Sequence, residues 1–235
     1  MKKNYILFTL LLVFALQLTT VSAQTKKLTF KELLDQTYYL NIADAMRSPQ
    51  HVYRLQHNVN GDKKLPADLL KLQNLQMLSL SGNTRKLDWE LAIQELAKIK
   101  SLQYVYFQDS GLQALPPQIF TLAQLKGLGV INTNVSVLPA DVSKLANLEY
   151  LVLINNRISV LPVQTGSLKN LKVLYLDGNN ISVFPPPMAN LKKLEELGIA
   201  DNPIKNEEMK KIRKYYPNAK IIESYEPASV IESID

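Results

Sequence analysis

A short repeat of constant length is the feature that most constrains this chain. Between Asn147 and Pro162 the apolar side chains follow L-x-x-L-x-L-x-x-N-x-L-x-x-L-P, which is neither a simple helical nor a simple strand period. The frame that starts here at Leu148 starts again at Leu171 and, earlier in the chain, at Leu125, so the two steps are equal. A single unit of this length cannot bury its own leucines, so the pattern predicts units that stack on one another.

The frame extends over seven units, from residue 52 to residue 204. Its step is constant throughout, except for one longer step between Leu75 in the second unit and Leu102 in the third. This pattern resembles the leucine-rich repeat family in its short, LP-containing form. The resemblance implies an α/β leucine-rich repeat solenoid, with a curved parallel sheet on its concave face, short helices or turns on its convex face, and helical N- and C-terminal caps.

Each position of the frame has a physical role. The last two leucines of L-x-x-L-x-L are two residues apart, so they share one face of a short strand and enter the core. An asparagine at the end of the strand can bond turn backbone that would otherwise be buried without a partner. Ser110 and Thr133 hold this position in the third and fourth units. In the other units we expect a ladder of asparagines: Asn60, Asn83, Asn156, Asn179 and Asn202.

Residues 1–23 differ in character from the rest of the chain. Two lysines precede an apolar run from Tyr5 to Leu18, and small residues follow up to Ala23. This arrangement predicts a secretory signal peptide that is cleaved after Ala23. The run is shorter than the ~20 residues that a membrane span needs. We therefore expect a secreted or periplasmic protein that has no membrane insertion once the signal is removed.

The two ends of the repeat array carry cap-like segments. Residues 24–51 are predicted to form an N-terminal helical cap over the first strand, because Thr29 and Glu32 have the spacing of a capping box. The helical region runs from Thr29 to Arg47, with a possible break near residues 39–41. Residues 205–222 are predicted to form a C-terminal cap, with a helix from Asn206 and a last strand at 219–222. Residues 223–235 are expected to be a flexible tail.

No constellation for catalysis is visible. The chain has no cysteine, only two histidines, and no G-x-S-x-G or H-E-x-x-H motif. We therefore expect no enzyme activity, no cofactor and no metal site. The formal charge of +6 is spread over interleaved basic and acidic residues, which argues against a nucleic-acid partner.

The remaining candidate site is the concave surface. Side chains beside the inward leucines should point to this face, and several of them are large and apolar: Tyr104, Tyr106, Tyr150, Val152, Ile154 and Tyr175. With no element covering them, they would expose more apolar surface than solubility requires. Tyrosine is also frequent at binding hot spots. The pattern predicts a monomeric, non-catalytic module that binds a protein partner, although the strand preference of Tyr, Val and Ile offers a purely structural explanation.

Other interpretations stay open. Aromatic rings also stack on sugars, so a carbohydrate or peptidoglycan ligand is an alternative, and a structural or adhesive protein of the cell envelope is another. The longer linker from Thr84 to Lys100 could carry binding around Trp89. A longer convex helix with Trp89 packed into the core is the simpler interpretation of that insertion.

Overall fold

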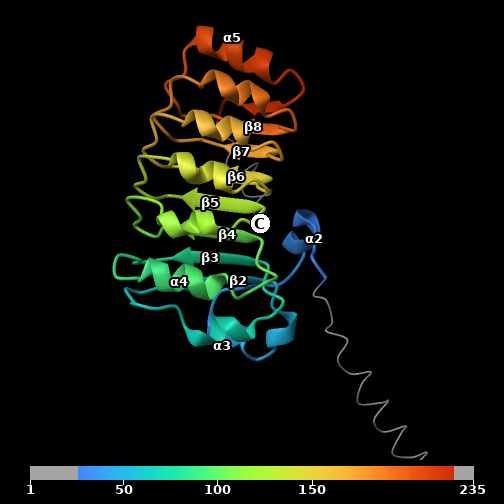
Figure 1. Ribbon diagram of the computed structural model, residues 1–235, viewed down its shortest axis with the longest axis vertical. Helices are drawn as coiled ribbons and strands as arrows, with labels where there is room; N and C mark the ends of the chain where they lie inside the picture. The colour runs from blue at the N-terminus through green and yellow to red at the C-terminus, as the bar shows by residue number, and fades with distance from the viewer. Residues whose placement is uncertain (1–25, 225–235) are drawn as a thin grey trace, which may run out of the picture.

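The computed structural model describes residues 26–224. The predicted signal peptide and residues 225–235 of the predicted tail lie outside this range. The described chain forms a parallel sheet of nine strands in which the order in space is the order in sequence (Figure 1). Each strand pairs with the next one, so the chain advances by one strand per repeat. The predicted leucine-rich repeat solenoid is confirmed.

The elements follow a regular order. The strands are β1 (Tyr38–Tyr39), β2 (Arg54–Asn58), β3 (Met77–Ser81), β4 (Tyr104–Gln108), β5 (Gly127–Ile131), β6 (Tyr150–Val152), β7 (Val173–Tyr175), β8 (Glu196–Gly198) and β9 (Lys220–Ile222). The α-helices are α2 (Phe30–Leu34), α3 (Ile42–Ala45), α4 (Trp89–Leu96) and α5 (Asn206–Tyr215). The 3₁₀ helices are η1 (Pro49–His51), η2 (Ala67–Lys71), η3 (Pro117–Thr121), η4 (Ala140–Lys144), η5 (Val163–Ser167) and η6 (Pro186–Asn190).

The core lies between the sheet and the helices of the convex side. Leu151 and Leu174 face each other across β6 and β7 in register, and both are fully buried. The proline of each LP pair stands at the start of a 3₁₀ helix, as at Pro139 and Pro162, where a missing backbone donor leaves no hydrogen bond unmade. These short helices return the chain to the next strand.

The asparagine ladder is shorter than predicted. Asn156, Asn179 and Asn202 each donate from the side-chain amide to main-chain carbonyls of their own repeat and of the preceding repeat. The prediction is wrong for Asn60 and Asn83, which are exposed. Asn60 itself has the positive φ of its turn (48°). Next to Asn83, the buried side chain of Thr84 instead donates a hydrogen bond to the Ser110 carbonyl of the next repeat.

The N-terminal region contains two short helices rather than one long one. Tyr38 and Tyr39 form β1, which pairs in parallel with β2 and so provides partners for the first strand of the array. Asn41 then starts α3 by accepting a hydrogen bond from the Asp44 amide. Two adjacent tyrosines favour a strand over a helix, which explains the interruption.

Two other irregular segments contain helices that pack against the core. The long linker forms α4, in which the Trp89 ring packs edge-on against Phe107 at 5.4 Å. At the far end, α5 begins at Asn206, and β9 adds a last strand beside β8. Residues of α4 and α5 therefore both pack into or against the hydrophobic core.

Candidate functional site on the concave face

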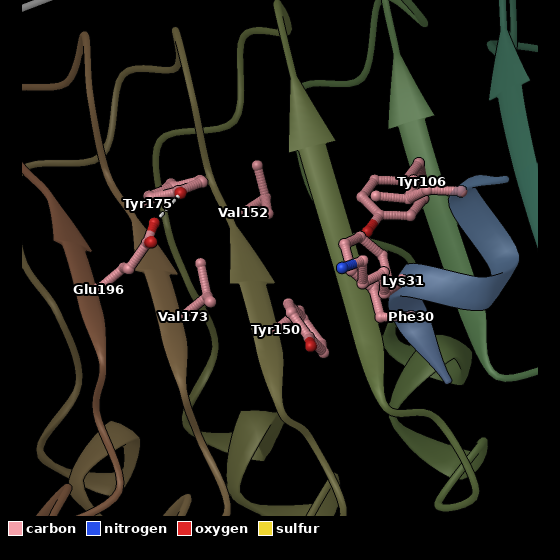
Figure 2. A pocket seen from close by; sticks show the side chains of 9 residues that line it. Phe30, Lys31, Tyr106, Tyr150, Val152, Val173, Tyr175 and Glu196 are labelled. Atoms are coloured by element: carbon pink, nitrogen blue, oxygen red, sulfur yellow. Dashed lines mark hydrogen bonds between the residues drawn. The ribbon is translucent and has the colours of Figure 1, made fainter. Parts of the chain in front are cut away.

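The sheet has one face that carries the 3₁₀ helices, and we call the opposite face the concave face. Helix α2 lies on this concave face (Figures 1 and 2). Leu28 and Leu33 are buried there together with Met77, Tyr104 and Tyr106. We call residues 26–36 the strap, because they cross this face from one edge. The expectation that no element covers the concave tyrosines is thus wrong, since the strap covers the first part of the predicted surface.

The sequence around Thr29 explains why the strap turns into a helix. The Thr29 side chain accepts a hydrogen bond from the Glu32 amide, and the Glu32 carboxylate accepts one from the Thr29 amide at 2.8 Å. This is the predicted capping box. The bonds from Thr29 lower the pKa of Glu32, so the carboxylate that caps the helix is ionised at neutral pH.

Polar side chains of the sheet hold both ends of the strap. Gln76 donates to the Lys26 carbonyl at 2.8 Å and accepts from the Leu28 amide at 2.9 Å, in the manner of a neighbouring strand. Arg54 donates to the Leu34 carbonyl at 2.7 Å, at the end of α2. Gln76 and Arg54 are both buried. All of these bonds reach main-chain atoms of the strap.

Aromatic contacts hold its centre. The Phe30 ring stacks on Tyr150, with 4.3 Å between ring centroids and 27° between the ring planes. It also contacts Tyr104 in a tilted arrangement at 5.2 Å. Such pairs contribute roughly 0.5–1.5 kcal/mol beyond the burial of their area. The Phe30 side chain therefore links the strap to tyrosines of both β4 and β6.

Glycines on neighbouring strands make room for the buried tyrosines. In the sheet register Tyr104 faces Gly127 and Tyr106 faces Gly129. A Cβ atom at Gly127 would lie 2.4 Å from the Tyr104 ring, and one at Gly129 would lie 1.9 Å from the Tyr106 ring. Both rings therefore lie flat over the next strand, and only 1% of Tyr104 and 4% of Tyr106 is exposed.

Tyr175 follows the same rule opposite Gly198, where a Cβ atom would lie 2.9 Å from its ring. Its hydroxyl donates a hydrogen bond to the Glu196 carboxylate on β8.

Burial raises the pKa of Tyr104 and Tyr106 well above the usual range. These phenols stay protonated at physiological pH and act as apolar surface rather than as acids.

A pocket of about 250 Å³ opens beside α2 (Figure 2). Tyr150, Val152 and Val173 lie on its sheet side, and the residues of α2 lie at its other end. Its charged groups are the Glu196 carboxylate beside Tyr175 and the exposed ammonium of Lys31. The further lining residues are Phe30, Leu34 and Tyr106. The pocket is thus mostly apolar, with one acidic and one basic side chain.

The structure places the predicted site residues in one cluster, in which they have different environments. Tyr104, Tyr106, Val152, Ile154 and Tyr175 are buried, whereas Tyr150 is half-buried. Of these residues Tyr106, Tyr150, Val152 and Tyr175 line the pocket, whereas Tyr104 and Ile154 do not.

Sequence reasoning missed the strap residues and Glu196 as part of this surface. Tyr150, Val173 and Glu196 occupy the same position in three successive repeat units. The repeat frame could therefore have placed Glu196 on the concave face. No repeat position corresponds to Phe30 or Lys31, so the frame had no means of placing them.

Other chemistry is not evident in the part of the chain that the structure describes. Within residues 26–224, no group of three or more His, Asp or Glu side chains is arranged to hold a metal ion. None of the helices in that range is both long and apolar enough to cross a membrane.

The fold and its repeats define a leucine-rich repeat solenoid, and comparison with known proteins agrees. Residues 146–204 match the family model described as "Leucine rich repeat". No curated protein matches the sequence.

Several solved structures are similar to this chain. A leucine-rich repeat protein of Leptospira interrogans is 29% identical, with a TM-score of 0.56 over 72% of this chain and 48% of that chain. An internalin of Listeria monocytogenes is 20% identical, with a TM-score of 0.58 over 84% and 57%. The plant peptide hormone receptor RGFR1 in complex with RGF2 is 24% identical, with a TM-score of 0.51 over 73% and 27%. The chain spans about half of the first two structures and about a quarter of the third.

Proposed function

We propose that this protein is a non-catalytic protein-binding module whose binding site is the concave pocket between α2 and strands β6–β8. The observation that carries the proposal is the pocket itself, in which Tyr150 and Val173 remain partly exposed beside the Glu196 carboxylate. Apolar pockets with a few placed polar groups are the usual form of binding sites. A monomer that is secreted or periplasmic would present this face to partners outside the cytoplasm.

The chemistry of the pocket favours a peptide segment over a sugar. A sugar brings many hydroxyl groups, and a hydroxyl buried without a partner loses its hydrogen bonds to water. Here the floor is made of Val152 and Val173, and the Glu196 carboxylate already accepts a bond from Tyr175. An aliphatic or aromatic side chain of a protein partner would cover these two valines and exclude water from them. A basic residue of the partner next to that side chain would pair with the Glu196 carboxylate.

The fold also supports a protein partner. The structure of a peptide hormone receptor in complex with RGF2 has a similar solenoid. This likeness concerns the fold, and specificity depends on the side chains of each surface. The partner of the present chain is therefore described by the pocket chemistry alone.

A pair of matched substitutions tests the proposal. Val173→Glu puts a carboxylate into the pocket beside Glu196, whereas Val163→Glu makes the same change at an exposed valine of η5 on the convex side. The immobilised mature chains are incubated with an extract of the source cells, and the retained proteins are identified by mass spectrometry.

The unchanged chain and Val163→Glu should retain the same protein, and Val173→Glu should lose it. Circular dichroism is the check that both variants are folded. Equal retention by all three chains would place the interface elsewhere, and the surface around Trp89 would then be the next candidate.

A further inference from the structure

The strap is seated on the face that the repeats present for binding. Its helix α2 has only five residues, and helices of this length are not stable alone in water. Its position therefore depends on contacts with the sheet. The segment that already lies on this face shows which kind of chain the face accepts.

Main-chain atoms make the polar contacts described at the two ends of the strap. Gln76 bonds the amide of Leu28 and the carbonyl of Lys26, and Arg54 bonds the carbonyls of Leu34 and Gln36. Any chain with the same backbone shape can make these bonds. It needs a short extended stretch beside Gln76 and a helix end at Arg54.

Side chains supply the sequence preference. Leu33 is fully buried and Leu28 is 7% exposed, while Phe30 stacks on Tyr150 and Leu34 lines the pocket. Phe30, Leu33 and Leu34 follow helical spacing (i, i+3, i+4), so one face of a single turn carries all three. This short pattern is what the concave aromatic cluster recognises.

We infer that the strap is an intramolecular occupant of the binding face, and that it competes with a protein partner bearing a similar segment. That partner segment is a short amphipathic helix with an aromatic residue and with leucines three and four residues after it. An extended stretch of chain precedes the helix. The inference rests on the proposed function. It adds the chemistry of the partner and predicts that binding displaces α2 from Tyr104 and Tyr150.

A labelled peptide of residues 26–36 is the probe. The double variant Phe30→Ala, Leu33→Ala weakens the strap but leaves the sheet unchanged. By fluorescence anisotropy this variant should bind the peptide at least about tenfold more tightly than the unchanged chain, because an occupied site lowers the apparent affinity by the fraction that is free. Asp35→Ala, an exposed change in the same strap, should behave like the unchanged chain.

A peptide with alanine at the Phe30 and Leu33 positions should bind neither protein. A folded double variant with no gain in affinity would overturn the inference. If the double variant does not fold, hydrogen exchange of the unchanged chain decides. Saturating peptide should speed exchange of the amides at 30–34, and an unchanged rate would show that the strap is a fixed part of the fold.

The two proposals can fail separately. If a protein partner depends on Val173 but leaves the exchange of residues 30–34 unchanged, the pocket binds without displacing the strap, and this inference is wrong. If the partner is insensitive to Val173→Glu, the proposed site is wrong whatever the peptide does.

Discussion

The asparagine ladder gives the sharpest stability prediction. Asn179 is 4% exposed, donates to the carbonyls of Leu153 and Leu176, and accepts from the Ile158 amide at 3.0 Å. Replacing it by alanine leaves at least one buried donor and one buried acceptor without their side-chain partner. A buried group left unpaired costs about 1–3 kcal/mol, so Asn179→Ala should lower the free energy of unfolding by about 3 kcal/mol.

Asn83 provides the matched control, because it occupies the same frame position but is exposed. Its side chain accepts one bond from the Arg85 amide at 3.2 Å. Asn83→Ala should change the free energy of unfolding by no more than about 0.5 kcal/mol. Urea unfolding followed by circular dichroism measures both variants. Equal losses at the two positions would refute the reasoning, because burial would then not decide the cost.

Three further predictions concern the core, the tyrosines and the N-terminus. Leu174→Ala should lower the free energy of unfolding by about 2–5 kcal/mol, because Leu174 is fully buried; an unchanged urea midpoint would contradict its inward position. Burial raises the pKa of Tyr104, Tyr106 and Tyr216 above the ordinary 10.0. Only the unfolded chain then releases these protons near that pH, so the contribution of these tyrosines to stability should be constant well below pH 10 and fall above it, with a slope that approaches about 1.4 kcal/mol per pH unit for each tyrosine. Urea unfolding between pH 9 and about 11 checks this, and a flat profile would contradict the burial. N-terminal sequencing of exported protein should begin at Gln24, and retention of Met1 would refute the predicted signal.

The solenoid could be predicted because its determinants repeat. Leu151 and Leu174 recur at a constant step, so one frame assigns the inward face of each strand and the register between neighbours. The ladder was predicted less completely. The frame gives the position of Asn60 along the chain but not the φ of its turn, and that φ turns its side chain to the solvent.

The cover on the concave face could not be predicted from the frame. The capping box at Thr29 predicts a helix, and the structure contains it, but local pattern does not say against which surface the helix packs. That choice depends on contacts over long sequence separations, such as Leu28 with Gln76 and Phe30 with Tyr150. The glycines opposite Tyr104 and Tyr106 could have predicted that these tyrosines are buried. A ring beside a glycine can lie flat on the sheet instead of projecting into solvent.

Photo-crosslinking tests the central claim most directly, namely that the concave pocket is the protein-binding site. Benzoylphenylalanine is placed at Val173 in the pocket or at Val163 on the convex side, and adducts formed with the captured partner are mapped by mass spectrometry. Position 173 should form an adduct with a helical segment of the partner, and position 163 should form none. An adduct from position 163 with none from position 173 would contradict the account.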